Sequence, residues 1–202
     1  MDALTPFISA AGLSWASGLR LYATLALAGL AHALGWMQLP SALAVLGNPW
    51  VIGGTGVLAA IEFGVDKIPG LDSVWDSVHT FLKIPAGVAL AAGSAYGLGE
   101  HWVLLAGLLG GGLAASTALA KSSTRLLVNA SPEPFTNWGA SLAEDSVWVV
   151  SMAWLLANPA TFAVVLVVLV VLTVYFLLWV RRALQKVGKA LGHVFQRTHS
   201  SQ

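Results

Sequence analysis

The side chains best suited to chemistry lie in one polar block, EFGVDKIPGLDSVWDSVHTFLKIP, which begins at Glu62 in an otherwise apolar chain. Glu62 and Asp66 are one helical turn apart, and after a Pro-Gly break Asp72, Asp76 and His79 follow at helical spacing. That spacing places the last three on one face of a helix. Two carboxylates and an imidazole could relay protons or bind a divalent cation, or they could cap and solvate a helix at the membrane surface. We favour a proton or ion pathway, because Glu62 and Asp66 extend the acidic line into the preceding segment.

Residues 72–83 are predicted to form a short helix that is either amphipathic or re-entrant. Asp72 follows the Pro-Gly break, where an acidic N-cap residue is expected. Trp75, Val78 and Leu82 form an apolar face beside the acidic one. Such a helix would present its carboxylates at the mouth of a membrane pathway.

A second polar block, KSSTRLLVNASPEPFTNWGASLAED, begins at Lys121. Lys121 and Arg125 share a helical face, and beyond the SPEP break Asn137, Ser141 and Glu144 resume at helical spacing. The basic pair could hold a lipid phosphate, but for Lys121 we expect ordinary anchoring at the cytoplasmic side of the membrane. Asn137 and Ser141 are typical of residues that join helices through hydrogen bonds.

Charges at membrane depth are costly, so they usually face a protein interior or a wet cavity. The candidates are Arg20, Glu62, Glu144 and Asp145, with Asp66 and Lys67 at the edge of a span. Glu144 and Asp145 fall in the middle of a predicted span, so each must be paired with a cation or protonated. Arg20 either reaches the headgroups from the end of its span or serves as a counter-ion for these acids.

The composition requires a membrane for this protein. Hydrophobic residues make up 57% of the 202 positions and charged residues only 9%, against roughly 25% charged in an average soluble domain. Mean hydropathy is +0.77. A globular protein of this length cannot bury so much apolar surface. The absence of cysteine excludes disulfides and thiolate catalysis.

About 20 apolar residues are needed for a helix to cross the hydrocarbon core. The sequence predicts an all-α membrane protein with about six transmembrane helices, at residues 17–36, 48–65, 84–99, 101–120, 137–157 and 159–180. The third is short and could span only with help from residues before Pro85. With six spans the basic residues fall on one side of the membrane, so both termini are predicted to be cytoplasmic.

The chain is predicted to divide into a helical membrane domain, residues 1–180, and a basic cytoplasmic tail, residues 181–202. The N-terminal stretch has no basic region and no cleavage site, so we expect it in the mature protein. The tail is interpreted as an extension of the last span. Alternatively, it rests as an amphipathic helix on anionic lipid headgroups.

Two alignments raise the hypothesis of an internal repeat. The tetrapeptide DSVW occurs at residues 72–75 and 145–148, and in the predicted topology this pairing gives an inverted repeat. The second alignment pairs LGNP at residues 46–49 with LANP at residues 156–159 and gives parallel copies. The two alignments exclude each other.

The blocks EFGVDKIPGLDSVWDSVHTFLKIPAGVALA and RLLVNASPEPFTNWGASLAEDS, together with an early SGLRLY, resemble a family of small bacterial integral membrane proteins, the DUF4126-type domain of unknown function. The resemblance runs from about Ser14 to Trp154. It implies a bacterial inner-membrane location and no particular activity. The positions that it marks are Glu62, Asp66, Lys67, Asp72, Trp75, Asp76, His79, Arg125, Asn129, Glu133, Asn137, Glu144 and Asp145.

The function that these patterns favour is a small transporter or channel, because polar, Pro-broken segments with carboxylates at membrane depth are typical of transporters. Arg20 would be a counter-ion. The alternatives are binding or flipping of a lipid-linked phosphate, and a non-catalytic membrane assembly subunit. We expect no enzyme, no metal and no cofactor, because no GxSxG, HExxH or cysteine nucleophile is present. The expected partners are the lipid bilayer, anionic headgroups at the tail and further copies of the chain, but not nucleic acid.

Overall fold

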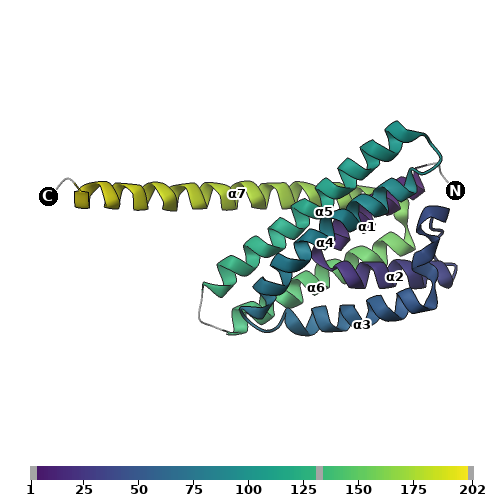
Figure 1. Ribbon diagram of the computed structural model, residues 1–202, viewed down its shortest axis with the longest axis horizontal. Helices are drawn as coiled ribbons and strands as arrows, with labels where there is room; N and C mark the ends of the chain where they lie inside the picture. Colours follow the sequence, from purple (N-terminus) through teal and green to yellow (C-terminus); the bar gives the residue numbers. More distant parts are fainter. Residues whose placement is uncertain (1–3, 131–133, 200–202) are drawn as a thin grey trace.

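The computed structural model describes residues 4–130 and 134–199, and every regular element in this part of the chain is a helix (Figure 1). The elements are α1 (Thr5–Leu19), α2 (Leu21–Ala33), the short 3₁₀ helix η1 (Ser41–Gly47), α3 (Pro49–Val65), α4 (Leu71–Ser94), α5 (Glu100–Asn129), α6 (Pro134–Ala157) and α7 (Pro159–His199). The predicted all-α class is confirmed.

The first two helices form a V whose apex is Arg20. This residue alone has extended backbone, with φ −137° and ψ 92°, between the end of α1 and the start of α2. In α1, Gly12 lies against Phe162 in the first turn of α7, and in α2, Gly29 lies against Leu46 of η1. Both open ends of the V therefore lie at one end of the molecule, and the apex lies inside it (Figure 1).

The predicted span at residues 17–36 is therefore wrong, because the chain turns back at Arg20. The prediction that both termini lie on one side depended on that crossing. The start of α1 and the far end of α7 lie at opposite ends of the molecule (Figure 1). The V returns the chain to its starting end, and helices α3 to α7 then run alternately up and down the bundle.

Three helices, α5, α6 and α7, are long and apolar enough to cross a membrane, and η1 with α3, bent by 67°, could form a fourth, broken span. Six spans are not confirmed by this measure. Helix α4 has 24 residues, as α6 does. It contains the buried charges Asp72, Asp76 and Lys83, which lower its hydropathy.

Residues 72–83 do not form a separate re-entrant helix. They are the first half of α4, which continues through Pro85 to Ser94. The N-cap position is Gly70, at φ +84°, so Asp72 lies in the first turn rather than at the cap. The predicted third span thus receives the extra length that it needed from the residues before Pro85.

Helices α1, α4 and α5 pack closely through small residues. A Cβ atom on Gly110 of α5 would overlap the Gly87 carbonyl oxygen and the Ala91 side chain of α4. Ser14 of α1 donates a hydrogen bond to the Gly87 carbonyl oxygen over 3.0 Å. Small residues let helix backbones approach in this way where lipid offers no hydrophobic driving force.

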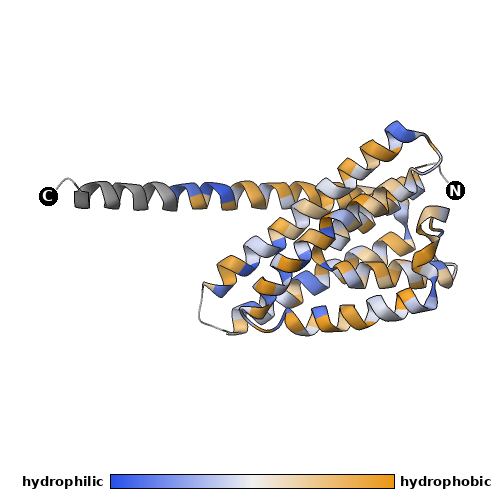
Figure 2. Cartoon of the chain, in the orientation of Figure 1, coloured by the Kyte–Doolittle hydropathy of each residue, from blue (hydrophilic) through white to orange (hydrophobic). Residues whose placement is uncertain are grey.

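The outer surface is apolar, as contact with lipid requires. The first part of α7 is almost entirely hydrophobic, and a hydrophilic stretch follows (Figure 2). That stretch contains Arg181 and Arg182, and α7 continues without a break to His199. The tail therefore extends the last helix, in agreement with the favoured interpretation.

The matched tetrapeptides lie on helices that run in the same direction. DSVW occurs near the start of α4 and in the middle of α6, and these helices run parallel (Figure 1). LGNP and LANP lead into α3 and α7, where Asn48 and Asn158 each accept a hydrogen bond from a backbone N–H of the first turn. The internal repeat stays a hypothesis. The spans that the first alignment pairs, in α4 and α7, run in opposite directions, and the helices that the second alignment pairs, α3 and α7, run in the same direction, as each alignment predicts (Figure 1).

Candidate functional site

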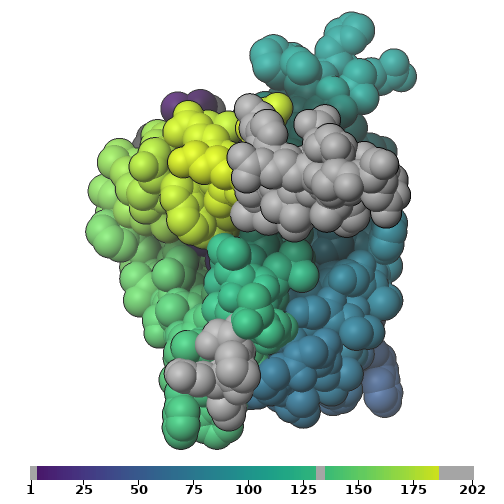
Figure 3. Space-filling view, turned by 90° about the vertical axis from the view of Figure 1, so that its left-hand side faces the viewer, coloured from purple at the N-terminus to yellow at the C-terminus, as the bar shows by residue number. Residues whose placement is uncertain are grey.

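A network of charged side chains fills the bundle near the end where α3, α5 and the first turns of α4 and α6 meet. Figure 3 shows this end of the molecule, where the blue surface of α3 and α4 lies beside the green surface of α5 and α6. Among the described residues the network has six carboxylates and five cations. The carboxylates are Glu62, Asp66, Asp72, Asp76, Glu144 and Asp145, and the cations are Arg20, Lys67, Lys83, Lys121 and Arg125.

Asp66 joins the apex of the V to α5. Its Oδ2 atom lies 3.2 Å from Nη2 of Arg20 and 2.8 Å from Nζ of Lys121. Lys121 also donates a hydrogen bond to the carbonyl oxygen of Leu19, the last residue of α1, over 3.3 Å. A cation at a helix C-terminus is favourable because unpaired carbonyls point there. Lys121 therefore stabilises the break as well as the ion pair.

Asp76 joins two lysines deep in the bundle. Its Oδ1 atom lies 2.7 Å from Nζ of Lys83 and 3.2 Å from Nζ of Lys121. Lys83 is twelve residues beyond Leu71, the first residue of α4. At 1.5 Å per residue this is about 18 Å along the helix. A fully buried lysine at that depth needs its carboxylate partner.

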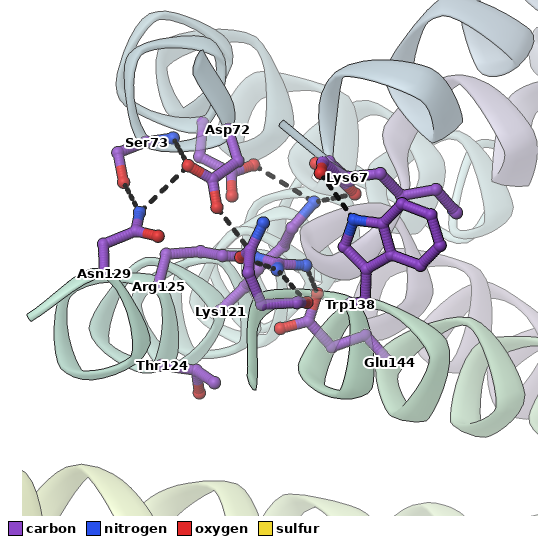
Figure 4. Close-up of polar contacts among 12 residues, drawn as sticks. Lys67, Asp72, Ser73, Lys121, Thr124, Arg125, Asn129, Trp138 and Glu144 are labelled. Carbon is purple, nitrogen blue, oxygen red and sulfur yellow. Dashed lines mark hydrogen bonds and ion pairs between the residues drawn. The ribbon is translucent and has the colours of Figure 1, made fainter. Parts of the chain in front are cut away.

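Arg125 binds three groups closer to the end of the bundle (Figure 4). Its Nη2 atom donates to Glu144 over 2.5 Å, Nη1 donates to Oδ1 of Asn137 over 2.9 Å, and Nε lies 3.7 Å from Asp72. Asn129, one turn further along α5, donates to Oδ1 of Asp72 over 3.0 Å. Arg125 thus holds the starts of α4 and α6 against α5.

Asp145 lies at the edge of the network, where it pairs with Arg20 and, over 3.5 Å, with Lys67. The Lys67 ammonium also lies 3.0 Å from the centre of the Phe63 ring. Trp138 donates from its indole N–H to the Lys67 carbonyl oxygen (Figure 4). The side chain of Lys67 is 22% exposed, so this edge is the most open part of the network.

Glu62 differs from every other carboxylate in the network. Its side chain is 0% exposed, and neither oxygen has a hydrogen-bond partner among the described residues. Asp66, one turn away on α3, has two cationic partners. A buried carboxylate without a partner is unfavourable, so Glu62 marks the place where the network is incomplete.

The structure brings together most of the predicted site residues, including the predicted counter-ion Arg20 with Asp145 and Asp66. His79 does not join the ion pairs: it hydrogen-bonds the Trp75 carbonyl oxygen over 2.8 Å and stacks on the Trp75 ring. Glu133 lies outside the described residues. No group of three or more His, Cys, Asp or Glu side chains that could hold a metal is found in the described part of the chain.

Sequence reasoning missed Lys83 and misjudged Lys121. The positive-inside pattern assigned both to the membrane surface, yet they are 0% and 2% exposed. The sequence did contain a signal for the ion pair of Lys83, because Asp76 and Lys83 are seven residues apart and therefore share a helix face. For Lys121 the partners Asp66 and Asp76 come from other helices, and sequence spacing could not reveal them.

Two cations of the network are each shared by two carboxylates. Lys121 is shared by Asp66 and Asp76, and Arg20 is shared by Asp66 and Asp145. A shared cation can leave one carboxylate without becoming unpaired itself. The ion pairs therefore form a continuous line of alternating charges from the open edge at Lys67 to the buried Lys83.

Comparison with known proteins identifies the family of this chain but assigns it no activity. No curated protein and no solved structure matches the chain. The family described as "Domain of unknown function (DUF4126)" matches residues 7–179, which include both halves of the V and the whole charged network. The chain belongs to this family.

Proposed function

We propose that this protein is a small membrane transporter or channel for protons, cations or small solutes, and that it is not an enzyme. The observation that carries the proposal is the V of α1 and α2, whose apex places Arg20 among buried carboxylates inside the bundle. Helices broken inside a membrane expose backbone dipoles and are typical of transporter binding sites.

The placement of the network supports a pathway for ions or solutes rather than a purely structural role. Replacing buried ion pairs with apolar residues is often neutral or stabilising, so a large ionic core is weak support for a structural role. Intramembrane charges that face a bundle interior usually mark ion or substrate pathways. Here they connect the half-open edge at Lys67 with the fully buried Lys83.

The proposed location is a bacterial cytoplasmic membrane, with the end that carries Lys67, Arg181 and Arg182 facing the cytoplasm. The positive-inside rule favours this orientation, because the loops at the other end contain no lysine or arginine. The exposed Arg181, Arg182 and Lys186 then lie where anionic headgroups are available.

Flux measurements in proteoliposomes test the proposal. The double variant Glu144→Gln/Asp145→Asn neutralises two ion-paired carboxylates and should lose proton or cation flux. Because the loss of these pairs also lowers the free energy of unfolding, flux is compared per folded protein recovered from detergent. Asp145→Asn alone, which leaves Arg20 paired with Asp66, is measured beside it and should also lose flux. Glu100→Gln is the matched control, because Glu100 is exposed and lies outside the network, and it should keep wild-type flux. Unchanged flux in the double variant, or no flux from the wild type with any ion tested, would contradict the proposal.

Handling of a lipid-linked phosphate is the weaker alternative. The residues that would bind the phosphate are Arg20, Lys67 and Arg125. Arg20 and Arg125 are 4% and 0% exposed, and all three are already paired with carboxylates. An anionic headgroup would have to displace those carboxylates. An assembly role is likewise secondary, because it gives no reason for a buried carboxylate without a partner.

A further inference from the structure

The charges of the network do not balance. Six carboxylates face five cations among the described residues, so the network has one negative charge too many if every group is ionised. Each cation and five of the carboxylates take part in at least one ion pair. Glu62 takes part in none. The surplus charge can therefore be assigned to a single side chain.

The groups around Glu62 come from each element packed beside it. Its charge interacts with those of Lys121 on α5, Lys83 on α4, Arg20 at the apex of the V and Asp66 on its own helix. Tyr22 of α2 is also within electrostatic range. The three cations are already paired with Asp66, Asp76 or Asp145. Glu62 is therefore a base placed beside cations that already have other carboxylate partners.

The geometry points to a proton as the ion that Glu62 binds. A metal cation needs several oxygen or nitrogen ligands, and no group of three suitable side chains is found in the described residues. A proton needs only one oxygen. Protonation converts the carboxylate into a neutral acid, removes the surplus charge and leaves five carboxylates with five cations.

We propose that Glu62 is the proton-binding group of the transport site, and that it takes up and releases the proton coupled to transport. This inference rests on the proposed function for its use in coupling, but the protonation itself does not. Two half-buried rings lie beside this site: Tyr22, which is within electrostatic range of Glu62, and His79, which packs against Tyr22 in a T-shaped arrangement with 5.6 Å between centroids.

Infrared spectroscopy of the purified protein tests the assignment without any transport assay. The wild type near neutral pH should show a carboxylic-acid C=O band that shifts in heavy water. Glu62→Gln should abolish this band, and Glu100→Gln, at an exposed site outside the network, should leave it unchanged. A wild type with no such band, or a band that survives Glu62→Gln, would overturn the inference.

A second measurement needs no variant and so does not depend on folding. An apolar carbodiimide reacts with buried, protonated carboxylic acids, and mass spectrometry locates the adduct. Modification of Glu62 supports the inference, and modification of Glu144 or Asp145 with Glu62 unmodified overturns it. Protonated Glu62 in a protein without flux would refute the proposed function alone. Flux from a protein whose Glu62 is ionised would refute the inference alone.

Discussion

Asp66 and Glu62 lie one turn apart on α3, and both are completely buried, yet their surroundings differ. Asp66 forms ion pairs with Arg20 and Lys121, whereas Glu62 has no hydrogen-bond partner among the described residues. Removing one member of a buried ion pair leaves an uncompensated charge, while removing an unpartnered charge relieves an unfavourable one. The same chemical change should therefore have different effects at the two positions.

Asp66→Asn should lower the free energy of unfolding by about 3–5 kcal/mol, because Arg20 and Lys121 lose a shared carboxylate. Glu62→Gln should leave the free energy of unfolding unchanged or raise it, because glutamine has the shape of the protonated acid. Denaturant titration in detergent, followed by tryptophan fluorescence, measures both. Equal destabilisation by the two substitutions would show that Glu62 also has a partner.

Helix breaks and close helix contacts determine how the elements assemble. On α5, Gly110 faces Gly87 and Ala91 so closely that a methyl group does not fit, whereas Gly112, two residues on, has open space around its Cβ position. The two glycines lie in one helix and differ only in the side to which they point. They therefore form a matched pair for testing the α4–α5 contact.

Gly110→Ala should destabilise the protein by about 1–3 kcal/mol, because the new methyl group forces α4 and α5 apart. Gly112→Ala should be neutral or stabilise by up to about 1 kcal/mol through helix propensity. Thermal unfolding in detergent compares the two. A harmless Gly110→Ala would mean that the α4–α5 interface is looser than described.

Ser14 adds a hydrogen bond from α1 to the same contact, through the Gly87 carbonyl oxygen. Separation of α4 from α5 should therefore disturb α1 and the apex of the V as well. In Gly110→Ala, proton or cation flux in proteoliposomes should fall further than the loss of folded protein explains.

At the scale of the whole molecule, the V changes the number of membrane crossings between the termini. Helices α3 to α7 run alternately between the two ends, so the start of α1 and the far end of α7 lie at opposite ends (Figure 1). With the basic end in the cytoplasm, the N-terminal end of α1 should face the other compartment.

Because the chain contains no cysteine, single cysteines can report on this topology without any background. Leu4→Cys and Tyr96→Cys, at exposed positions of one end, should react with an impermeant maleimide in intact cells. Ile68→Cys and Gln185→Cys, at exposed positions of the other end, should react only after permeabilisation. The same accessibility for Leu4→Cys and Gln185→Cys would restore the prediction of two cytoplasmic termini.

The helical class and the membrane environment followed from the sequence because both depend on residue types along short stretches. The apolar run of α7, the Asn-Pro starts of α3 and α7, and the extension of α4 back through residues 72–83 are all local features. The helical spacing of Glu62 and Asp66, and of Asp72 and Asp76, likewise placed these acids on shared helix faces. Most of the candidate site could be predicted in this way.

The V at Arg20 had no such local cause, because neither proline nor glycine occupies the break. Arg20 is buried between Asp66 of α3 and Asp145 of α6, and Lys121 of α5 caps the end of α1. These partners are 46, 125 and 101 positions away in sequence. Only the folded bundle brings them together, and for the same reason only the folded bundle shows that Glu62 has been left without a cation.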